Sequence, residues 1–262
     1  MTKKILSNAI NACVERGNKA FVPYIMAGDG GMTALKEQIL FLQKAGVTAI
    51  ELGIPFSDPV ADGPVIQEAG ERALSSGVTL RKVLKELTLF IDEVTVPLVI
   101  MSYLNPILSY GIPEFVEDCG NSGVRGLIVP DLPLEENDLL RDALADSEIA
   151  LIQLVSLTSP PERIQKITAA GEGFIYAVTV NGITGVRDGF GDELEAHLEG
   201  LKAVSSVPVL AGFGISTPEQ VQSIGAYADG VIVGSAIVDA FHRGDLPAVA
   251  ALVKAAEKEV YS

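Results

Sequence analysis

Short, nearly continuous apolar segments recur along the whole chain, and amphipathic segments separate them. Such apolar runs are typical of parallel β-strands covered on both faces, and the segments between them have helical spacing. The amphipathic segments include residues 32–46, 80–94, 135–147 and 217–228. We predict eight strands, at Ala20–Gly28, Ala49–Gly53, Pro97–Tyr103, Gly126–Asp131, Ala150–Ser156, Phe174–Val180, Pro208–Gly214 and Gly230–Ala236.

This alternation predicts an α/β fold, a single-domain (β/α)8 TIM barrel over residues 1–262. Each amphipathic segment joins one strand to the next in the same direction. A doubly wound sheet of eight parallel strands is the alternative that we favour less. No Pro/Ser-rich linker or charge block divides the chain, and the lack of tight identical repeats disfavours a solenoid.

An extra N-terminal helix is predicted before the first strand. Gly17 is placed to end it. Its apolar stripe consists of Ile5, Leu6, Ala9, Ile10, Cys13 and Val14. We expect this helix to cover the N-terminal end of the barrel.

The formal net charge of -15 disfavours binding to nucleic acid or to anionic lipid. A phosphorylated ligand would also be repelled, so a phosphate site has to use backbone N–H groups at loops and helix starts. Cys13 and Cys119 lack CxxC spacing, and no run of 18 apolar residues occurs, so we expect a soluble cytoplasmic protein. His197 and His242 are too far apart in sequence to suggest zinc.

The segment "ELGIPFSDPVADGP" contains the strongest candidates for chemistry. Active sites of such barrels form at the C-terminal ends of the strands. Glu51 lies inside the second strand, where burial should raise its pKa and suit it to acid and base catalysis. A buried structural hydrogen bond is the alternative for Glu51, and ordinary turn or capping roles are the alternatives for Asp58 and Asp62.

Glycine-rich turns follow the last three strands. "GFGIST" and "GSAI" place small residues at helix starts, and from them we select Gly212, Gly214, Ile215, Gly234 and Ser235 as a phosphate cradle. Tight turns alone would also explain these glycines. The segment from Gly182 to Gly191 is interpreted as a mobile lid with Thr184 and Arg187, or else as a plain surface loop.

No lysine falls in the C-terminal half of a predicted strand, so an imine-forming aldolase would lack its nucleophile. The histidines needed by a metal-dependent aldolase are also missing. Cleavage of a carbon–carbon bond at this site would therefore rely on carboxylates, with the substrate itself as the electron sink.

The sequence resembles the tryptophan synthase alpha subunit family. The motif "ELGIPFSDPVADGPVIQ" carries the resemblance, and "AFVPYIMAGD", "YLNPIL", "VPDLPLEE", "NGITGVR", "AGFGIS" and "GSAI" follow that family's order. It spans essentially the whole chain. The "VTVNG" that precedes the lid motif departs from the family's usual Ser/Thr-Gly form.

The resemblance implies retro-aldol cleavage of indole-3-glycerol phosphate to indole and glyceraldehyde 3-phosphate, with protonation of the indole at C3 providing the electron sink. Glu51 matches the catalytic acid and base, and Asp62 matches the carboxylate facing the indole N–H. Tyr176 matches the active-site tyrosine and Thr184 the lid threonine. Gly185, Phe213, Gly214, Ile215, Gly234 and Ser235 match the phosphate-binding positions, and Tyr24, Met101, Tyr103, Ile128 and Pro130 match the apolar indole pocket.

The resemblance also implies a partner. Pro55 and Asp58 match positions that contact a beta subunit, which receives indole through a tunnel and uses pyridoxal phosphate. The implied assembly is an alpha-beta-beta-alpha heterotetramer, and no cofactor is expected in this chain. A sugar-phosphate isomerase, a non-catalytic partner of the beta subunit and a stand-alone indole-releasing lyase remain alternatives.

Overall fold

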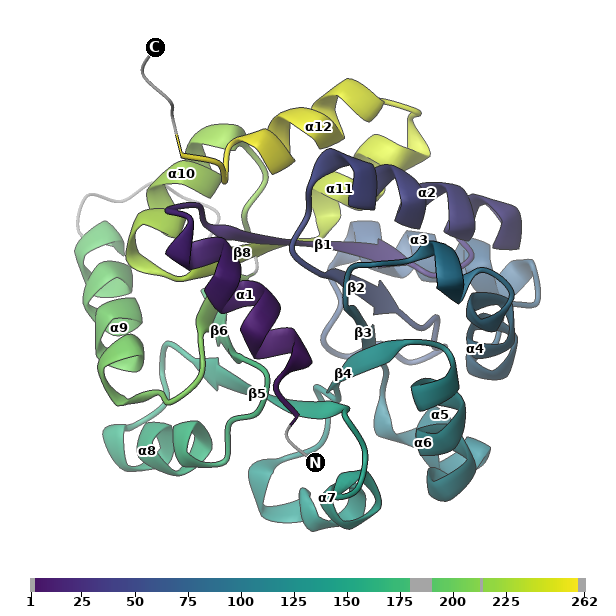
Figure 1. The fold of residues 1–262 in the computed structure, drawn as a ribbon, viewed down its shortest axis with the longest axis horizontal. Helices are drawn as coiled ribbons and strands as arrows, with labels where there is room; N and C mark the ends of the chain where they lie inside the picture. Colours follow the sequence, from purple (N-terminus) through teal and green to yellow (C-terminus); the bar gives the residue numbers. More distant parts are fainter. Residues whose placement is uncertain (1–2, 180–189, 213, 259–262) are drawn as a thin grey trace.

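The structure is a computed structural model that describes residues 3–179, 190–212 and 214–258. Eight parallel strands form one closed barrel in chain order, so each strand pairs with its neighbours in sequence and β8 pairs with β1 (Figure 1). The strands are β1 Ala20–Met26, β2 Ile50–Gly53, β3 Leu98–Met101, β4 Val124–Ile128, β5 Ala150–Ser156, β6 Ile175–Val178, β7 Val209–Gly212 and β8 Gly230–Val233. The prediction of a TIM barrel is therefore confirmed.

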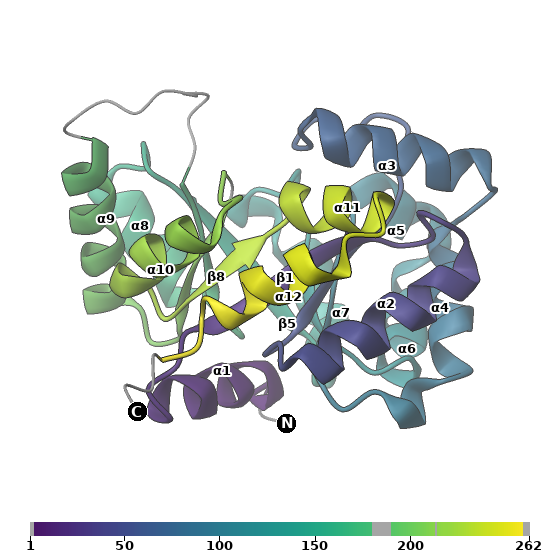
Figure 2. The ribbon, with the colours of Figure 1, turned by 90° about the horizontal axis from the view of Figure 1, so that it is seen from above.

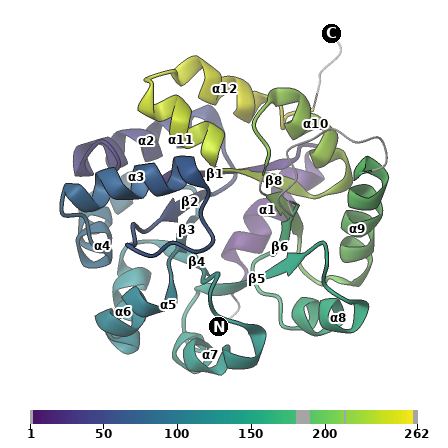
Figure 3. The same cartoon turned by 180° about the vertical axis from the view of Figure 1, so that it is seen from behind.

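Helices surround the barrel, as Figures 1 and 3 show from its two ends. Their apolar faces pack on the strands, because a parallel sheet must be covered on its outer face. The helices are α1 Ile5–Glu15, α2 Met32–Ala45, α3 Pro64–Ser75, α4 Leu80–Thr88, α5 Leu104–Tyr110, α6 Ile112–Asn121, α7 Asp138–Leu144, α8 Pro161–Ala169, α9 Phe190–Val204, α10 Pro218–Tyr227, α11 Ser235–His242 and α12 Leu246–Lys254. Short 3-10 turns lie at Ile91–Glu93 and Leu134–Glu136.

Several predicted element boundaries were wrong. Most strands end earlier than predicted because residues beyond the last strand pair, such as Ala27 and Val129, remain buried and look strand-like in sequence. β4 begins at Val124 instead of Gly126, and the half-buried Arg125 masks this start. The predicted helix 80–94 ends at Thr88 and is followed by a separate 3-10 turn.

The extra helix α1 lies across one end of the barrel, nearest the viewer in Figure 1 and beneath the barrel in Figure 2. Leu6 of α1 is fully buried, and its side chain lies 3.0 Å from where a Cβ at Gly126 or at Gly173 would be. Because Gly126 lies near the start of β4 and Gly173 precedes β6, α1 closes the N-terminal end of the barrel. This prediction is confirmed.

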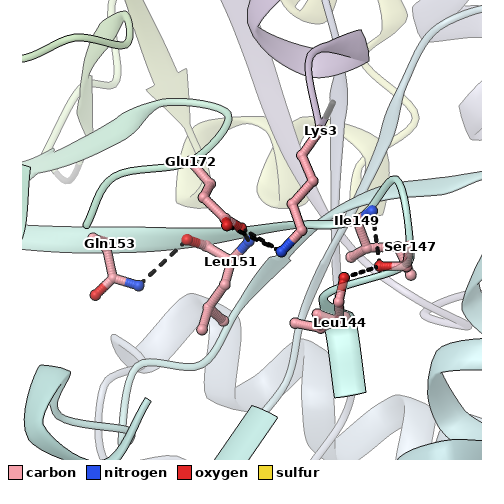
Figure 4. Close-up of polar contacts among 7 residues, drawn as sticks. All are labelled: Lys3, Leu144, Ser147, Ile149, Leu151, Gln153 and Glu172. Atoms are coloured by element: carbon pink, nitrogen blue, oxygen red, sulfur yellow. Dashed lines mark hydrogen bonds and ion pairs between the residues drawn. The ribbon is translucent and has the colours of Figure 1, made fainter. Parts of the chain in front are cut away.

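An ion pair fastens the segment before α1 to the same end of the barrel. The Lys3 ammonium lies 2.9 Å from a Glu172 carboxylate oxygen, and this oxygen also accepts a 2.8 Å hydrogen bond from the Leu151 N–H (Figure 4). Since Leu151 belongs to β5, one carboxylate connects the N-terminal segment to the barrel wall.

Within the described residues, no helix is long and apolar enough to cross a membrane.

Candidate active site

A cavity of about 350 Å³ lies at the C-terminal ends of the strands, opposite α1. Each of the eight strands, or the loop that follows it, contributes to the lining. The lining residues are Tyr24, Glu51, Ala61, Asp62, Gly63, Ile66, Met101, Ile128, Pro130, Leu154, Tyr176, Gly214, Ile215, Ser216, Ile232, Gly234 and Ser235. Two carboxylates, two tyrosines and a mainly aliphatic wall therefore share one enclosed space.

Glu51 is the most buried acid of this cavity. It is the second residue of β2, and its side chain is only 2% exposed. Burial, followed by the nearby charge of Asp62, raises the pKa of Glu51 to about 8. Among the described residues no hydrogen-bond donor reaches Glu51 Oε2. Glu51 is consequently protonated at neutral pH and has a free oxygen directed at the cavity, as a general acid requires.

Asp62 lies in the loop between β2 and α3, and the Tyr103 side chain contacts this loop. Burial raises the pKa of Asp62 to about 6, and a hydrogen bond from the Tyr103 side chain opposes this rise. The Tyr103 hydroxyl also accepts a 2.9 Å hydrogen bond from the Ala61 N–H. Asp62 is therefore mostly ionised at neutral pH, while Glu51 is mostly protonated.

The apolar wall contains four of the five residues that the resemblance places there, namely Tyr24, Met101, Ile128 and Pro130. Tyr103 differs, because it does not line the cavity; it stacks on Phe56 with ring centroids 5.2 Å apart and contacts the Asp62 loop. Tyr176 of β6 lines the cavity as well. These side chains make this part of the cavity wall mainly apolar.

The start of α11 provides the best anion site among the described residues. Gly234 is the N-cap of α11 and Ser235 its first residue; both line the cavity, and no side chain caps this helix. The first N–H groups of a helix lack partners within the helix and attract anions. Among the described residues no Lys or Arg lines the cavity, so these residues would bind an anion through backbone donors, as the net charge predicted.

The neighbouring helix α10 is occupied by its own cap. Gln220 Oε1 accepts hydrogen bonds from the N–H groups of Ser216 (2.8 Å) and Thr217 (3.2 Å), within a complete capping box. These two donors are therefore already satisfied. Gly214 (φ +77°) and Ile215 still lie in the cavity wall and remain candidates on the preceding turn.

Gly212 does not line the cavity, so its place in the cradle stays a prediction. A Cβ at Gly212 would lie 2.5 Å from the Tyr176 ring, so the lack of a side chain here accommodates Tyr176. Three further predicted residues, Thr184, Gly185 and Phe213, lie outside the described residues, as does Arg187.

The predicted partner positions lie on the loop between β2 and α3. Pro55 is buried at the base of this loop and Asp58 is exposed near its tip, where its carboxylate accepts a 2.6 Å hydrogen bond from Ser57. Val60 is 85% exposed on the same loop, which is unusual for an aliphatic side chain. The sequence analysis did not single out Val60.

Three large aliphatic residues of the cavity wall were not predicted, namely Ile66, Leu154 and Ile232. Leu154 and Ile232 belong to β5 and β8, whose residues are apolar on both faces, so the sequence pattern does not reveal which ones point inward. Ile66 lies on α3, at the end of the motif that begins at Glu51, but no role was predicted for it. The position of Ile66 in the chain could have suggested that it lines the site, because α3 begins directly after the Asp62 loop.

A larger cavity of about 870 Å³ lies between α2, α3 and the end of α11, outside the barrel. Two of its charged groups, Arg72 and Asp29, are paired with each other through hydrogen bonds of 2.7 and 2.8 Å. This cavity also lies away from the strand ends that carry Glu51 and Asp62.

Comparison with known proteins identifies relatives over the whole fold. The family model for the tryptophan synthase alpha chain matches residues 10–260. A tryptophan synthase alpha chain of Bacillus thuringiensis subsp. konkukian is 54% identical over 230 residues, covering 88% of this chain and 89% of the relative. Another from Bacillus cereus (strain ATCC 10987) is 50% identical over 250 residues, covering 95% and 97%.

Solved structures agree with this result. A tryptophan synthase structure from Mycobacterium tuberculosis superposes with a TM-score of 0.88 at 34% identity, covering 97% of this chain and 98% of the matched chain. The tryptophan synthase alpha chain of Legionella pneumophila subsp. pneumophila superposes with a TM-score of 0.84 at 35% identity, covering 97% and 95%.

Proposed function

The chain belongs to the tryptophan synthase alpha chain family, and on this premise we propose that it cleaves indole-3-glycerol phosphate to indole and glyceraldehyde 3-phosphate in L-tryptophan biosynthesis. The reaction is that of a lyase and proceeds by a retro-aldol step. One observation supports the assignment of residues above all: a protonated Glu51 and an ionised Asp62 face one apolar cavity.

Glu51 performs both proton transfers. As a neutral acid it gives its proton to C3 of the indole, which converts the ring into an indolenine and draws electrons toward the ring nitrogen. The resulting carboxylate removes the proton of the glycerol hydroxyl, the carbon–carbon bond breaks, and its electron pair restores the aromatic indole. Asp62 faces the ring N–H and stabilises the positive charge that develops there.

The phosphate group binds at the start of α11. Gly234 and Ser235 place N–H groups at the cavity, and no basic side chain of the described lining neutralises the ligand. Gly214 and Ile215 contribute from the turn after β7, together with Gly185 and Phe213. Tyr24, Met101, Ile128 and Pro130 surround the indole ring, and Tyr176 and Thr184 complete the site.

A beta subunit receives the indole, and pyridoxal phosphate belongs to that subunit and not to this chain. The resemblance places such a partner at the loop with Pro55, Asp58 and Val60, and covering the exposed Val60 side chain there would bury apolar area. We further infer an alpha-beta-beta-alpha assembly, a cytoplasmic location and a single domain spanning the chain.

The test is indole release from indole-3-glycerol phosphate, measured for the purified chain alone and with a tryptophan synthase beta subunit. Glu51→Gln should lower the rate at least about a thousandfold, since it removes the general acid and base together. Glu117→Gln, an exposed glutamate on α6, is the matched control and should keep the wild-type rate. Near-normal turnover by Glu51→Gln would contradict the role of Glu51, and an inactive wild type in both mixtures would contradict the reaction.

A further inference from the structure

One buried polar atom of the cavity, Glu51 Oε2, has no hydrogen-bond partner among the described residues. The Tyr24 side chain is only 5% exposed and lines the same cavity, and its hydroxyl makes no hydrogen bond within that part of the chain. Buried polar groups without partners are rare and call for an explanation. Both groups line the same cavity, so a shared explanation is the simplest.

The barrel places these two groups on the same side of the wall. Tyr24 of β1 is the register partner of Glu51 of β2, and both side chains point into the cavity. The Tyr24 ring leans over the end of β2, because a Cβ at Gly53 would lie only 1.8 Å from the Tyr24 hydroxyl oxygen. Gly53 and Glu51 are two positions apart on one strand and share a face. The hydroxyl therefore sits beside the strand face that carries Glu51.

Tyr176 occupies a comparable place across the barrel. It lies on β6, and its ring covers Gly212 at the end of β7, just as Tyr24 covers Gly53 at the end of β2. The resemblance assigns Tyr176 to the active site and Tyr24 only to an apolar pocket. The structure does not support that distinction, because both tyrosines are buried and reach the cavity.

We propose that Tyr24 is a positioning residue for the cleavage reaction, whose hydroxyl donates a hydrogen bond to the Glu51 carboxylate that forms when Glu51 gives up its proton. The proposal rests on the proposed function. Neutral Glu51 needs no such donor, whereas its carboxylate would otherwise be left buried without a partner. The interaction therefore strengthens as the reaction proceeds, which is the requirement for accelerating it.

Tyr24 is suited to this role because it keeps its proton. Burial first, and then the nearby charges of Asp62 and Glu51, raise the pKa of Tyr24 well above its ordinary value. The groups facing Glu51 are Asp62 from the loop after β2, Tyr24 from β1 and Tyr176 from β6, with Tyr103 behind Asp62. Replacing Tyr24 with Phe thus removes one donor and leaves the other titratable groups in place.

The experiment is the pH profile of kcat/KM for indole release by wild type and Tyr24→Phe. Loss of a donor to the carboxylate favours neutral Glu51, so the alkaline limb should move up by about one pH unit. At neutral pH kcat should fall about tenfold because Glu51 becomes a weaker acid, with KM changed less than about threefold. Tyr110→Phe is the control, since it removes a buried hydroxyl bonded to Asp118, far from the cavity, and should leave the profile unchanged.

The Glu51 carboxyl is titrated in parallel, by infrared difference spectroscopy of the ligand-free protein with Glu51→Gln used to assign the band. A raised titration midpoint in Tyr24→Phe supports the proposal. If wild type is active and the variant changes only KM, or moves neither the limb nor the midpoint, Tyr24 is merely part of the apolar wall and the proposal is overturned. An inactive wild type overturns the proposed function, while an unmoved midpoint overturns the hydrogen bond independently.

Discussion

Glu51 and Asp62 are carboxylic acids in one cavity, and their surroundings raise their pKa values to different extents. Glu51 is buried inside a strand without a donor to Oε2 among the described residues, whereas Asp62 is partly exposed and receives a hydrogen bond from Tyr103. Different environments thus divide the roles of acid and anion between two similar side chains.

This difference predicts a bell-shaped pH profile of kcat/KM. Below about pH 6 Asp62 is protonated and cannot stabilise charge at the indole nitrogen, and above about pH 8 Glu51 has lost the proton that it must donate. Steady-state indole release between pH 5 and 9 measures both limbs. Asp62→Asn should abolish the acidic limb with a loss of at least about a hundredfold in rate; an acidic limb that persists would exclude Asp62 as its source.

Glu51 should also make the protein less stable as the pH rises. Its folded-state pKa of about 8 lies above the unfolded value near 4.5, so the folded state binds the extra proton and stability falls across this interval. Glu51→Gln removes that effect. Thermal unfolding should therefore show the variant more stable than wild type at pH 8.5, by an amount on the order of a few kcal/mol, with the gap closing toward pH 5. A gap independent of pH would contradict a buried, titrating Glu51.

At the scale of single residues, the sequence predicted those side chains whose type is unusual for their position. An acid within an apolar strand stands out, which is why Glu51 could be identified. Leu154 and Ile232 could not, because an aliphatic residue facing the cavity looks the same in sequence as one facing the helices. The role of Tyr103 depends on a hydroxyl that reaches back to Ala61, a contact between separate loops that no local pattern encodes.

The secondary structure elements position the site through two glycines at strand ends. Gly53 leaves space for Tyr24 at the end of β2, and Gly212 does so for Tyr176 at the end of β7. Each bulky aromatic ring on one strand packs over a glycine on the next strand. The tyrosines can therefore lie over the barrel mouth while the strands stay in register.

Gly53→Ala should disturb this arrangement. Its Cβ would lie 1.8 Å from the Tyr24 oxygen, so Tyr24 has to leave its position, which should cost about 1–3 kcal/mol of stability and at least about tenfold in activity. Gly120→Ala on α6 meets no atom within 4 Å and should be neutral or stabilising by about 0.5–1 kcal/mol. Urea unfolding and indole release measure both effects. Equal behaviour of the two variants would contradict the packing role of Gly53.

The order and type of the eight strands were predictable because apolar runs and amphipathic segments alternate so regularly. Their ends were not, since Val129 and Ala27 are buried beyond the last paired residue. The Pro-rich and Gly-rich loops were correctly placed after the strands, and this placed Glu51 and Asp62 together. The interior of the Gly182–Gly191 segment lies mostly outside the described residues, so its role as a lid stays a prediction.

In the molecule as a whole, the elements that stabilise the barrel and the residues proposed to carry out the chemistry lie at opposite ends. α1 covers the N-terminal end of the barrel (Figure 2), and the Lys3–Glu172 pair lies at the same end. The cavity lies at the C-terminal ends of the strands. Changes at α1 should therefore alter stability without altering the reaction, a division expected for this barrel.

Leu6→Ala tests this separation. The side chain is fully buried against the barrel end, so its removal should cost about 2–4 kcal/mol of unfolding free energy. The rate of indole release per folded molecule, measured well below the unfolding temperature, should equal that of wild type. A reduced kcat in fully folded Leu6→Ala would show that the two ends of the barrel are coupled.

Lys3 and Lys258, the first and last residues described, both lie beside α1: Lys3 precedes it, and the Lys258 N–H donates to Asn18 just after it. Position 258 is exposed and both native cysteines are buried, so a Lys258→Cys variant offers one defined point for attaching the protein to a sensor chip or bead. An enzyme layer held in this way would turn the loop with Asp58 and Val60 outward, so that substrate and partner could be supplied in flow to molecules that share one orientation.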